Sequence, residues 1–198
     1  EARPPYINGG YQDINLSSYS NNIIVAAAKK IKKIVGRHER LATYIVGHSL
    51  STSHFSSNKF INSTILGIPF QIDNEIVVNI SNKSTIKANR FFRILHSPSN
   101  PKAKGTNIIK KAIENLLNKG YKIDLILIEN KSNAEVIDEI KKCDLVVDQV
   151  YSDFPLAGFA TEAAYFGKPA IVGGYGLEYL KSLTPAEFWP PSKICHPD

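Results

Sequence analysis

The chain has 198 residues, of which 43% are hydrophobic, a length and composition that suit one large or two small globular domains and exclude a disordered chain. It carries 24 Lys and Arg against 18 Asp and Glu, a net charge of +6 that favours an anionic partner. No stretch approaches 18 apolar residues, and neither an arginine-rich run nor a zinc-ligand spacing is present, so we expect no membrane-spanning segment, no nucleic-acid partner and no bound metal.

The first part of the chain is predicted to be separate from the part that follows residue 85. Residues 1–19 are rich in Pro, Gly, Asn and Ser, a composition typical of a loop. Residues 71–89 have a polar and mixed composition, which predicts a linker or crossover to the next domain. The chain begins with Glu and contains no Met, so we expect it to be a fragment of a longer protein.

Between these segments the sequence predicts one helix and two short strands. Isoleucine and valine recur at helical spacing over residues 22–35 while lysines fill other positions, and Gly36 is expected to end the helix. Apolar runs at 41–47 and 63–70 are typical of strands separated by a polar loop. The basic helix suits peripheral contact with a membrane surface, although ordinary packing is the favoured alternative.

Residues 86–198 are predicted to form a second, α/β domain. Strands are expected at 90–97, 121–130, 144–150 and 168–174, and helices at 105–120, 132–143 and 158–167. Strands that alternate with helices of this length indicate a Rossmann-like parallel sheet flanked by helices. In such a sheet ligands bind beyond the carboxyl ends of the strands, so the loops that follow strands are where binding residues are expected.

The loops after the first two of these strands carry candidate residues. The loop at 96–106 places Lys102 and Lys104 just before a helix N-terminus, where ammonium groups and free N–H groups suit a phosphate. An ordinary lysine-bearing loop is the alternative. Glu129 ends the second strand, where it can meet a base or ribose or lie in a solvated turn.

The loop after the third strand leads through small residues to Glu162 in the next helix. Ala157, Gly158 and Ala160 allow the backbone to approach a diphosphate, whose charge the helix N-terminus favours. One turn deeper, Glu162 can accept hydrogen bonds from ribose hydroxyls. The alternative is that Glu162 only interacts favourably with the helix dipole.

Three segments together resemble the donor-binding, C-terminal domain of the GT-B nucleotide-sugar glycosyltransferases, the group 1 or family 4-like enzymes. They are "RILHSPSNPKAKGTNIIKKAIENLL", "IKKCDLVVDQV" and "GFATEAAYFGKPAIVGG", and the resemblance spans about residues 90–174. It implies a GT-B architecture of two Rossmann-like domains, in which residues 1–85 are the remainder of an incomplete N-terminal, acceptor-side domain and residues 86–198 are the donor-binding domain. His48 and His54 then lie near the cleft between the domains, although a histidine in a polar loop is more often solvated.

The resemblance also implies roles for individual residues. Lys104 matches the family lysine that neutralises the donor diphosphate, and Glu162 matches the second glutamate of the paired-glutamate motif, which binds the donor ribose. Phe159 matches, with Gly158 and Ala160, the loop whose amides meet the phosphates and the sugar.

Two positions depart from the family pattern. Ser99 stands where the family commonly has an arginine, and Lys102 or Asn100 is then expected to supply the contact with the donor. Phe154 stands where the first glutamate of the motif is expected, and Asp153 substitutes for that glutamate only if the loop shifts by one residue.

The expected function is transfer of a sugar from a UDP- or GDP-sugar to a glycan or lipid-linked acceptor in bacterial surface polysaccharide synthesis. The resemblance implies a cytoplasmic enzyme, in some cases on the inner face of the membrane, that needs no cofactor and often retains the anomeric configuration. Two alternatives remain: a sugar-nucleotide epimerase of the same fold, and a non-catalytic binding module supported by Phe154 and Ser99. The sugar, the acceptor and the oligomeric state are left open.

Overall fold

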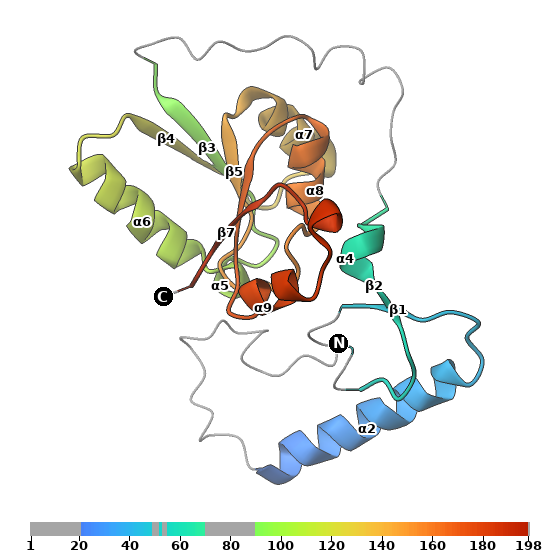
Figure 1. Ribbon diagram of the computed structural model, residues 1–198. Helices are drawn as coiled ribbons and strands as arrows, with labels where there is room; N and C mark the ends of the chain where they lie inside the picture. Colours follow the sequence, from blue (N-terminus) through green and yellow to red (C-terminus); the bar gives the residue numbers. More distant parts are fainter. Residues whose placement is uncertain (1–20, 49–51, 53–54, 70–89, 198) are drawn as a thin grey trace.

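The computed structural model describes residues 21–48, 52, 55–69 and 90–197 (Figure 1). The N-terminal part contains helix α2 (Asn21–Glu39), strands β1 (Val46–Gly47) and β2 (Ile61–Asn62), and helix α4 (Ser63–Leu66). The two strands pair in parallel, with Val46 opposite Ile61. The predicted loop at 1–19 and linker at 71–89, and with them the domain boundary at 85 and 86, lie outside the described residues.

Three predictions for this part are corrected by the structure. Helix α2 continues through Gly36, although a helical glycine costs about 1 kcal/mol, because the carboxylate of Glu39 in its last turn accepts hydrogen bonds from the Ser56 hydroxyl and, at 3.1 Å, from the Ser57 N–H. The run at 63–70 begins as helix α4 and not as a strand, since the Asn62 side chain caps it by accepting from the Thr64 N–H at 3.0 Å. Of the run at 41–47, only β1 is a strand.

The second part is a five-stranded parallel sheet in the order β4-β3-β5-β6-β7. Its strands are β3 (Phe92–His96), β4 (Ile123–Leu127), β5 (Leu145–Val147), β6 (Ala170–Gly173) and β7 (Lys193–Cys195). Its helices are α5 (Pro101–Lys104), α6 (Thr106–Asn118), α7 (Asn133–Lys142), α8 (Gly158–Tyr165) and α9 (Leu177–Ser182), followed by a 3-10 turn at Ala186–Phe188. The predicted α/β fold with a Rossmann-like parallel sheet is confirmed, while β7, α5 and α9 were not predicted.

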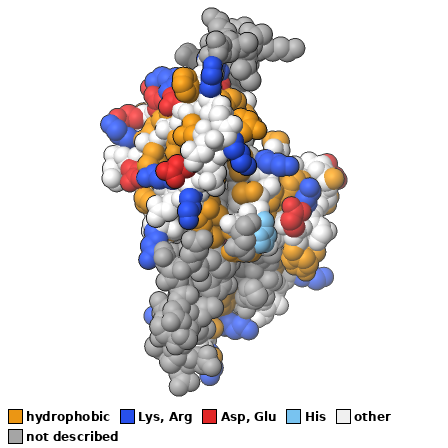
Figure 2. Space-filling model, turned by 90° about the vertical axis from the view of Figure 1, so that its left-hand side faces the viewer, with side chains coloured by type: hydrophobic (Ala, Val, Ile, Leu, Met, Phe, Trp, Pro, Cys, Tyr) orange, Lys and Arg blue, Asp and Glu red, His pale blue; other side chains and the backbone are white. Residues whose placement is uncertain are grey.

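Helices cover both faces of this sheet (Figure 1). On one face α6 buries Ile109 and Ile113 against Ile94 of β3. On the other face α7 and α8 bury a cluster that includes Ile140 and Ala163. Figure 2 shows that Lys, Arg, Asp and Glu side chains are intermixed over the face that α6 covers, so the net positive charge is not gathered into one basic patch there.

The strand order places the topological switch point between β3 and β5. The chain runs from β3 to its neighbour β4 and then returns to pair β5 with the other side of β3. In open parallel sheets the loops on either side of such a reversal separate and leave a crevice for ligands at the carboxyl ends of the strands. The loops after β3 and β5 are therefore the first place to look for a site.

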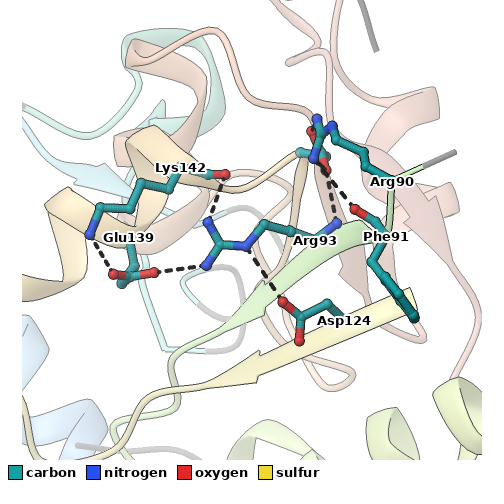
Figure 3. Close-up of polar contacts among 7 residues, drawn as sticks. Arg90, Phe91, Arg93, Asp124, Glu139 and Lys142 are labelled. Carbon is teal, nitrogen blue, oxygen red and sulfur yellow. Dashed lines mark hydrogen bonds and ion pairs between the residues drawn. The ribbon is translucent and has the colours of Figure 1, made fainter. Parts of the chain in front are cut away.

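The opposite edge of the sheet, where the strands begin, is here called the amino edge. A network of ion pairs and hydrogen bonds holds it together (Figure 3). Asp144, just before β5, accepts hydrogen bonds from the Arg90 guanidinium, at 2.8 Å from Nη1 to Oδ2, and from the Arg93 N–H at 2.8 Å. Burial acts to raise the pKa of Asp144, but these donors outweigh it and lower the pKa. The Arg93 guanidinium reaches Asp124 and Glu139 in turn. This network fastens β3 to β5 and α7.

Helix α7 begins with a capping box. The Ser132 side chain and the Glu135 carboxylate satisfy each other's backbone N–H groups in a capping box. Hydrogen bonds to Glu135, chiefly from the Ser132 N–H and then from Lys131, lower its pKa to about 2.

In the part of the chain that the structure describes, no helix has the length and apolar character needed to cross a bilayer.

Candidate functional site at the carboxyl edge of the sheet

Lys104 lies at the switch point, at the end of the one-turn helix α5. Its ammonium Nζ is 2.9 Å from Oδ1 of Asp148, the residue that directly follows β5. The Lys104 side chain is 20% exposed, whereas that of Asp148 is 1% exposed. The predicted phosphate-binding lysine is thus held from behind by a buried carboxylate and reaches solvent at the edge of the sheet.

Backbone contacts fix the loop after β3 against the loop after β5. Gly105 has φ of 74°, and a Cβ added there would come within 2.8 Å of the Val150 Cβ, so this position needs glycine for both its conformation and its space. The Val150 N–H donates to the Lys104 carbonyl at 3.0 Å. The lysine backbone is therefore positioned by the neighbouring loop.

Asp148 is incompletely paired. Its Oδ2 atom is buried and has no hydrogen-bond partner among the described residues. Buried carboxylate oxygens are nearly always satisfied, because an unpaired one loses its hydration without compensation. An exception of this kind points to a site rather than to a purely structural ion pair.

His96, the last residue of β3, lies buried beside this pair. Its Nδ1 is 2.8 Å from the Val147 carbonyl and must therefore carry the proton, which leaves Nε2 to accept from the Thr106 hydroxyl at 2.9 Å. Burial lowers the pKa of His96, although the Val147 carbonyl and Asp148 oppose the shift. His96 is accordingly a neutral side chain that is hydrogen-bonded through both ring nitrogens and so joins β3, β5 and the start of α6.

The loop after β5 is packed tightly against the end of β6. A Cβ added at Gly174 would lie 2.0 Å from the Ser152 carbonyl oxygen, and the Ser152 N–H donates to the Gly173 carbonyl at 2.8 Å. The Ser152 hydroxyl in turn donates to the Phe154 carbonyl at 2.6 Å and accepts from Gln149 at 2.7 Å. These bonds hold the loop that leads into α8.

Helix α8 begins at Gly158 without a side-chain cap. Its first amides, at Gly158, Phe159 and Ala160, have no carbonyl within the helix to bond, so the α8 N-terminus offers donors for an anion. Gly158 is exposed, and a Cβ there would meet no described atom within 4 Å. Phe159 and Ala160 pack their side chains into the core, so only their backbone is available to a ligand.

Glu162 occupies the second turn of α8 and is partly exposed. Its Oε1 accepts a hydrogen bond from the Asn133 side chain, at the first residue of α7, at 2.8 Å. Lys104 and Glu162 therefore lie on loops and helices of the same edge but have different partners. Among the described contacts, none joins Lys104 directly to Glu162, the two predicted catalytic residues.

The other predicted donor-binding residues are spread along the same edge. Asn100 caps α5, where its side chain accepts from the Ala103 N–H at 3.1 Å, which gives it a structural role beside the predicted one. Ser99 and Lys102 are exposed in and beside that turn, and Glu129 is exposed beyond the end of β4. Asp153 is partly buried in the loop after β5. Their roles towards a donor stay predictions.

Phe154 is buried against the N-terminal part of the chain. The centroid of its ring is 4.6 Å from that of the His48 ring, in an edge-to-face arrangement. His48 Nδ1 is in turn 2.9 Å from the Ser63 hydroxyl. His48 follows β1, so the carboxyl end of the small sheet lies against the loop after β5. His54 lies outside the described residues.

Sequence reasoning missed Asp148, His96 and Thr106. Asp148 was assigned to the strand "DLVVDQV" and His96 to the strand "RFFRILHS". The available signal was a carboxylate at the end of an apolar strand, a position that in a parallel sheet lies at the ligand edge. Which cation it meets depends on the strand order, which the sequence did not predict.

Within the described ranges, no group of three or more His, Cys, Asp or Glu side chains is arranged to hold a metal ion. Comparison of the chain with protein-family models, with curated proteins and with solved structures finds no match in any of the three.

Proposed function

We propose that this chain is part of a GT-B glycosyltransferase that binds a UDP- or GDP-sugar at the carboxyl edge of the sheet and transfers the sugar to a glycan or lipid-linked acceptor. The observation that carries the proposal is the position of Lys104, a partly exposed cation at the β3/β5 switch point. The motif resemblance of residues 90–174 supports the choice of reaction.

Two features suit the diphosphate of such a donor. The Lys104 ammonium has three N–H donors, of which Asp148 takes one, so two are left for phosphate oxygens. The start of α8 adds backbone N–H groups and the positive end of a helix dipole. When the glycosidic bond to the donor breaks, charge develops on the leaving diphosphate, and fixed cations and amides at that place lower the barrier.

Glu162 suits the ribose. A carboxylate accepts hydrogen bonds from hydroxyl groups, and among the described residues Asn133 bonds Oε1 of Glu162 and leaves Oε2 available. Because Glu162 lies one turn beyond the α8 N-terminus, it is set back from the proposed phosphate position and avoids direct repulsion of the phosphates.

A two-domain architecture is part of the proposal. The N-terminal part has a parallel strand pair, and His48 at its carboxyl end contacts Phe154 at the edge that carries Lys104. In this arrangement an acceptor bound by the N-terminal part would approach the donor from the side of His48. Peripheral contact of the basic helix α2 with a membrane belongs to the same proposal, because a lipid-linked acceptor would be presented there.

A non-catalytic, nucleotide-sugar-binding module is the second candidate. Phe154 favours it, because this residue stands where the family has its first glutamate. The residue is 5% exposed, and its ring packs against His48. A buried aromatic ring cannot accept hydrogen bonds from a donor sugar. The two candidates share the binding site and differ in turnover.

The first test is calorimetric titration of the chain with UDP, GDP, ADP and CMP. We expect one diphosphate to bind selectively and Lys104→Ala to weaken that binding severely. Lys119→Ala, which removes an exposed lysine at the far end of α6, is the matched control and should bind as the wild type does. Binding of wild-type affinity in Lys104→Ala would contradict the proposed site.

The second test addresses Glu162 through the ribose. We expect the wild type to bind the ribonucleoside diphosphate more tightly than its 2′-deoxy form, and Glu162→Gln to lose this preference. Glu178→Gln, an exposed carboxylate of α9, serves as the control. Release of nucleotide from the matching nucleotide sugar, with and without acceptor glycans, then separates the enzyme from the binding module.

A further inference from the structure

We propose that Asp148 sets how tightly this edge holds a nucleotide diphosphate, by acting as the counter-charge of Lys104. The inference rests on the proposed function, because it concerns the same edge. It adds a residue that the motif resemblance does not assign: Asp148 does not touch the ligand and acts through Lys104.

The first step is that Asp148 is placed to hold the lysine and little else. It is 1% exposed, its Oδ1 lies 2.9 Å from the Lys104 ammonium, and its Oδ2 has no partner among the described residues. His96 is close enough for the two charges to affect its titration, but both His96 nitrogens are bonded elsewhere. Asp148 therefore exerts its charge mainly on Lys104.

The second step concerns what that charge does to an anionic ligand. A cation opposed by a buried carboxylate attracts phosphate less strongly than a free cation does, because the two opposite charges partly cancel at the ligand. The cancellation is weakly screened, since the carboxylate is buried and water does not separate it from the lysine. The pair thus positions the ammonium while limiting its affinity for phosphate.

The third step links this limit to turnover. The nucleotide diphosphate that leaves after sugar transfer carries the charge that Lys104 attracts, and an unopposed lysine would retain this product. Asp148 remains bonded to the ammonium throughout and favours release of the product. A neutral residue that keeps the hydrogen bond to Lys104 should therefore bind the product more tightly than wild type.

Asp148→Asn makes this change, because its amide oxygen can still accept from the Lys104 ammonium. We expect the affinity for UDP, or for GDP if that is the diphosphate the wild type binds, to rise about tenfold in this variant. Inorganic pyrophosphate is titrated in parallel and should show the same direction. Asp148→Ser, smaller and also neutral, is the second variant if the amide is poorly accommodated, and thermal unfolding shows that each variant is folded.

A double-mutant cycle identifies the route of the effect. With Lys104 replaced by Met, the ammonium through which Asp148 acts is absent, so Asp148→Asn should raise the residual affinity for pyrophosphate less than it does in the wild-type background. Asp144→Asn is the matched control: it neutralises an aspartate four residues earlier, at the opposite edge, and should leave the affinity for the diphosphate unchanged.

An unchanged or weaker diphosphate affinity in a folded Asp148→Asn overturns this inference and leaves the proposed function standing. If neither the wild type nor any variant binds a nucleoside diphosphate, the proposed function falls and the inference falls with it.

Discussion

Asp144 and Asp148 lie on either side of the three residues of β5, at opposite edges of the sheet, and their carboxylates differ in hydrogen-bond partners. At the amino edge both oxygens of Asp144 are occupied by the Arg90 guanidinium, and Oδ2 also by the Arg93 N–H. At the carboxyl edge Asp148 bonds Lys104 through Oδ1, and its Oδ2 has no partner among the residues that the structure describes. Asp148 is nevertheless the more buried of the two, at 1% exposure against 9%.

This difference separates a structural ion pair from a candidate site. A buried carboxylate stabilises a fold only where its partners replace the lost water, as they do around Asp144. The incomplete pairing of Asp148 costs stability and is found where ligands bind in this class of sheet. We therefore expect changes at the amino edge to alter stability alone, and changes at the carboxyl edge to alter ligand binding as well.

The largest effect on stability is expected from Gly174→Ala, which displaces the backbone of the loop after β5 at the carboxyl edge. The added Cβ would lie 2.0 Å from the Ser152 carbonyl oxygen, so the loop after β5 must move. We expect a loss of about 3 kcal/mol in the free energy of unfolding, measured by urea denaturation. Binding of the diphosphate should weaken together with stability, and normal binding in this variant would show that the loop does not form the site.

Asp144→Ala should have the next largest effect and should act on stability alone. It removes the acceptor of the Arg93 N–H and of the Arg90 guanidinium, which costs about 2 kcal/mol in the free energy of unfolding. Calorimetry below the unfolding temperature should give an unchanged affinity for the diphosphate. A loss of affinity in the folded variant would contradict the division between the two edges.

The sequence predicts the long elements of the fold and misses the short ones. Helices α6 and α7 lie within two residues of the predicted bounds, because each has apolar residues at helical spacing and α7 has the cap at Ser132. Strand β7 has three residues, too few for a period to appear, and is formed by pairing with β6. For short elements, tertiary contacts decide what local propensity leaves open.

The candidate site follows the same rule. Lys104 was predicted because a lysine before a helix N-terminus is a local pattern, and Glu162 because it lies in a motif. Asp148 was missed because its significance depends on the distance to Lys104, which is 44 residues away in the chain. Phe154 was recognised as a departure from the motif, but its contact with His48 depends on how the N-terminal part packs.

The two edges should also separate in pH. Burial lowers the pKa of His96 below its ordinary value of 6.5, so its contribution to stability is present above that value and is lost as the pH falls towards the folded pKa. The pKa of Asp144 is also lowered, so the stability that Asp144 contributes is lost at lower pH, below its ordinary pKa of 3.8. We expect the free energy of unfolding to fall as the pH is lowered from about 7.5 to about 5.5, through His96. His96→Gln should remove this step, and Asp144→Asn should remove only the acidic one.

The smallest effect on stability is expected from Asn133→Ala, which tests whether the contact with Glu162 belongs to the carboxyl-edge site. The hydrogen bond is exposed, so its removal should cost about 0.5 kcal/mol in the free energy of unfolding. Without it the Glu162 carboxylate regains rotamer freedom, and the preference for a ribonucleoside over a 2′-deoxynucleoside diphosphate should weaken without disappearing. If the preference is unchanged, Asn133 does not orient Glu162 for the ribose, and its contact is structural like those around Asp144.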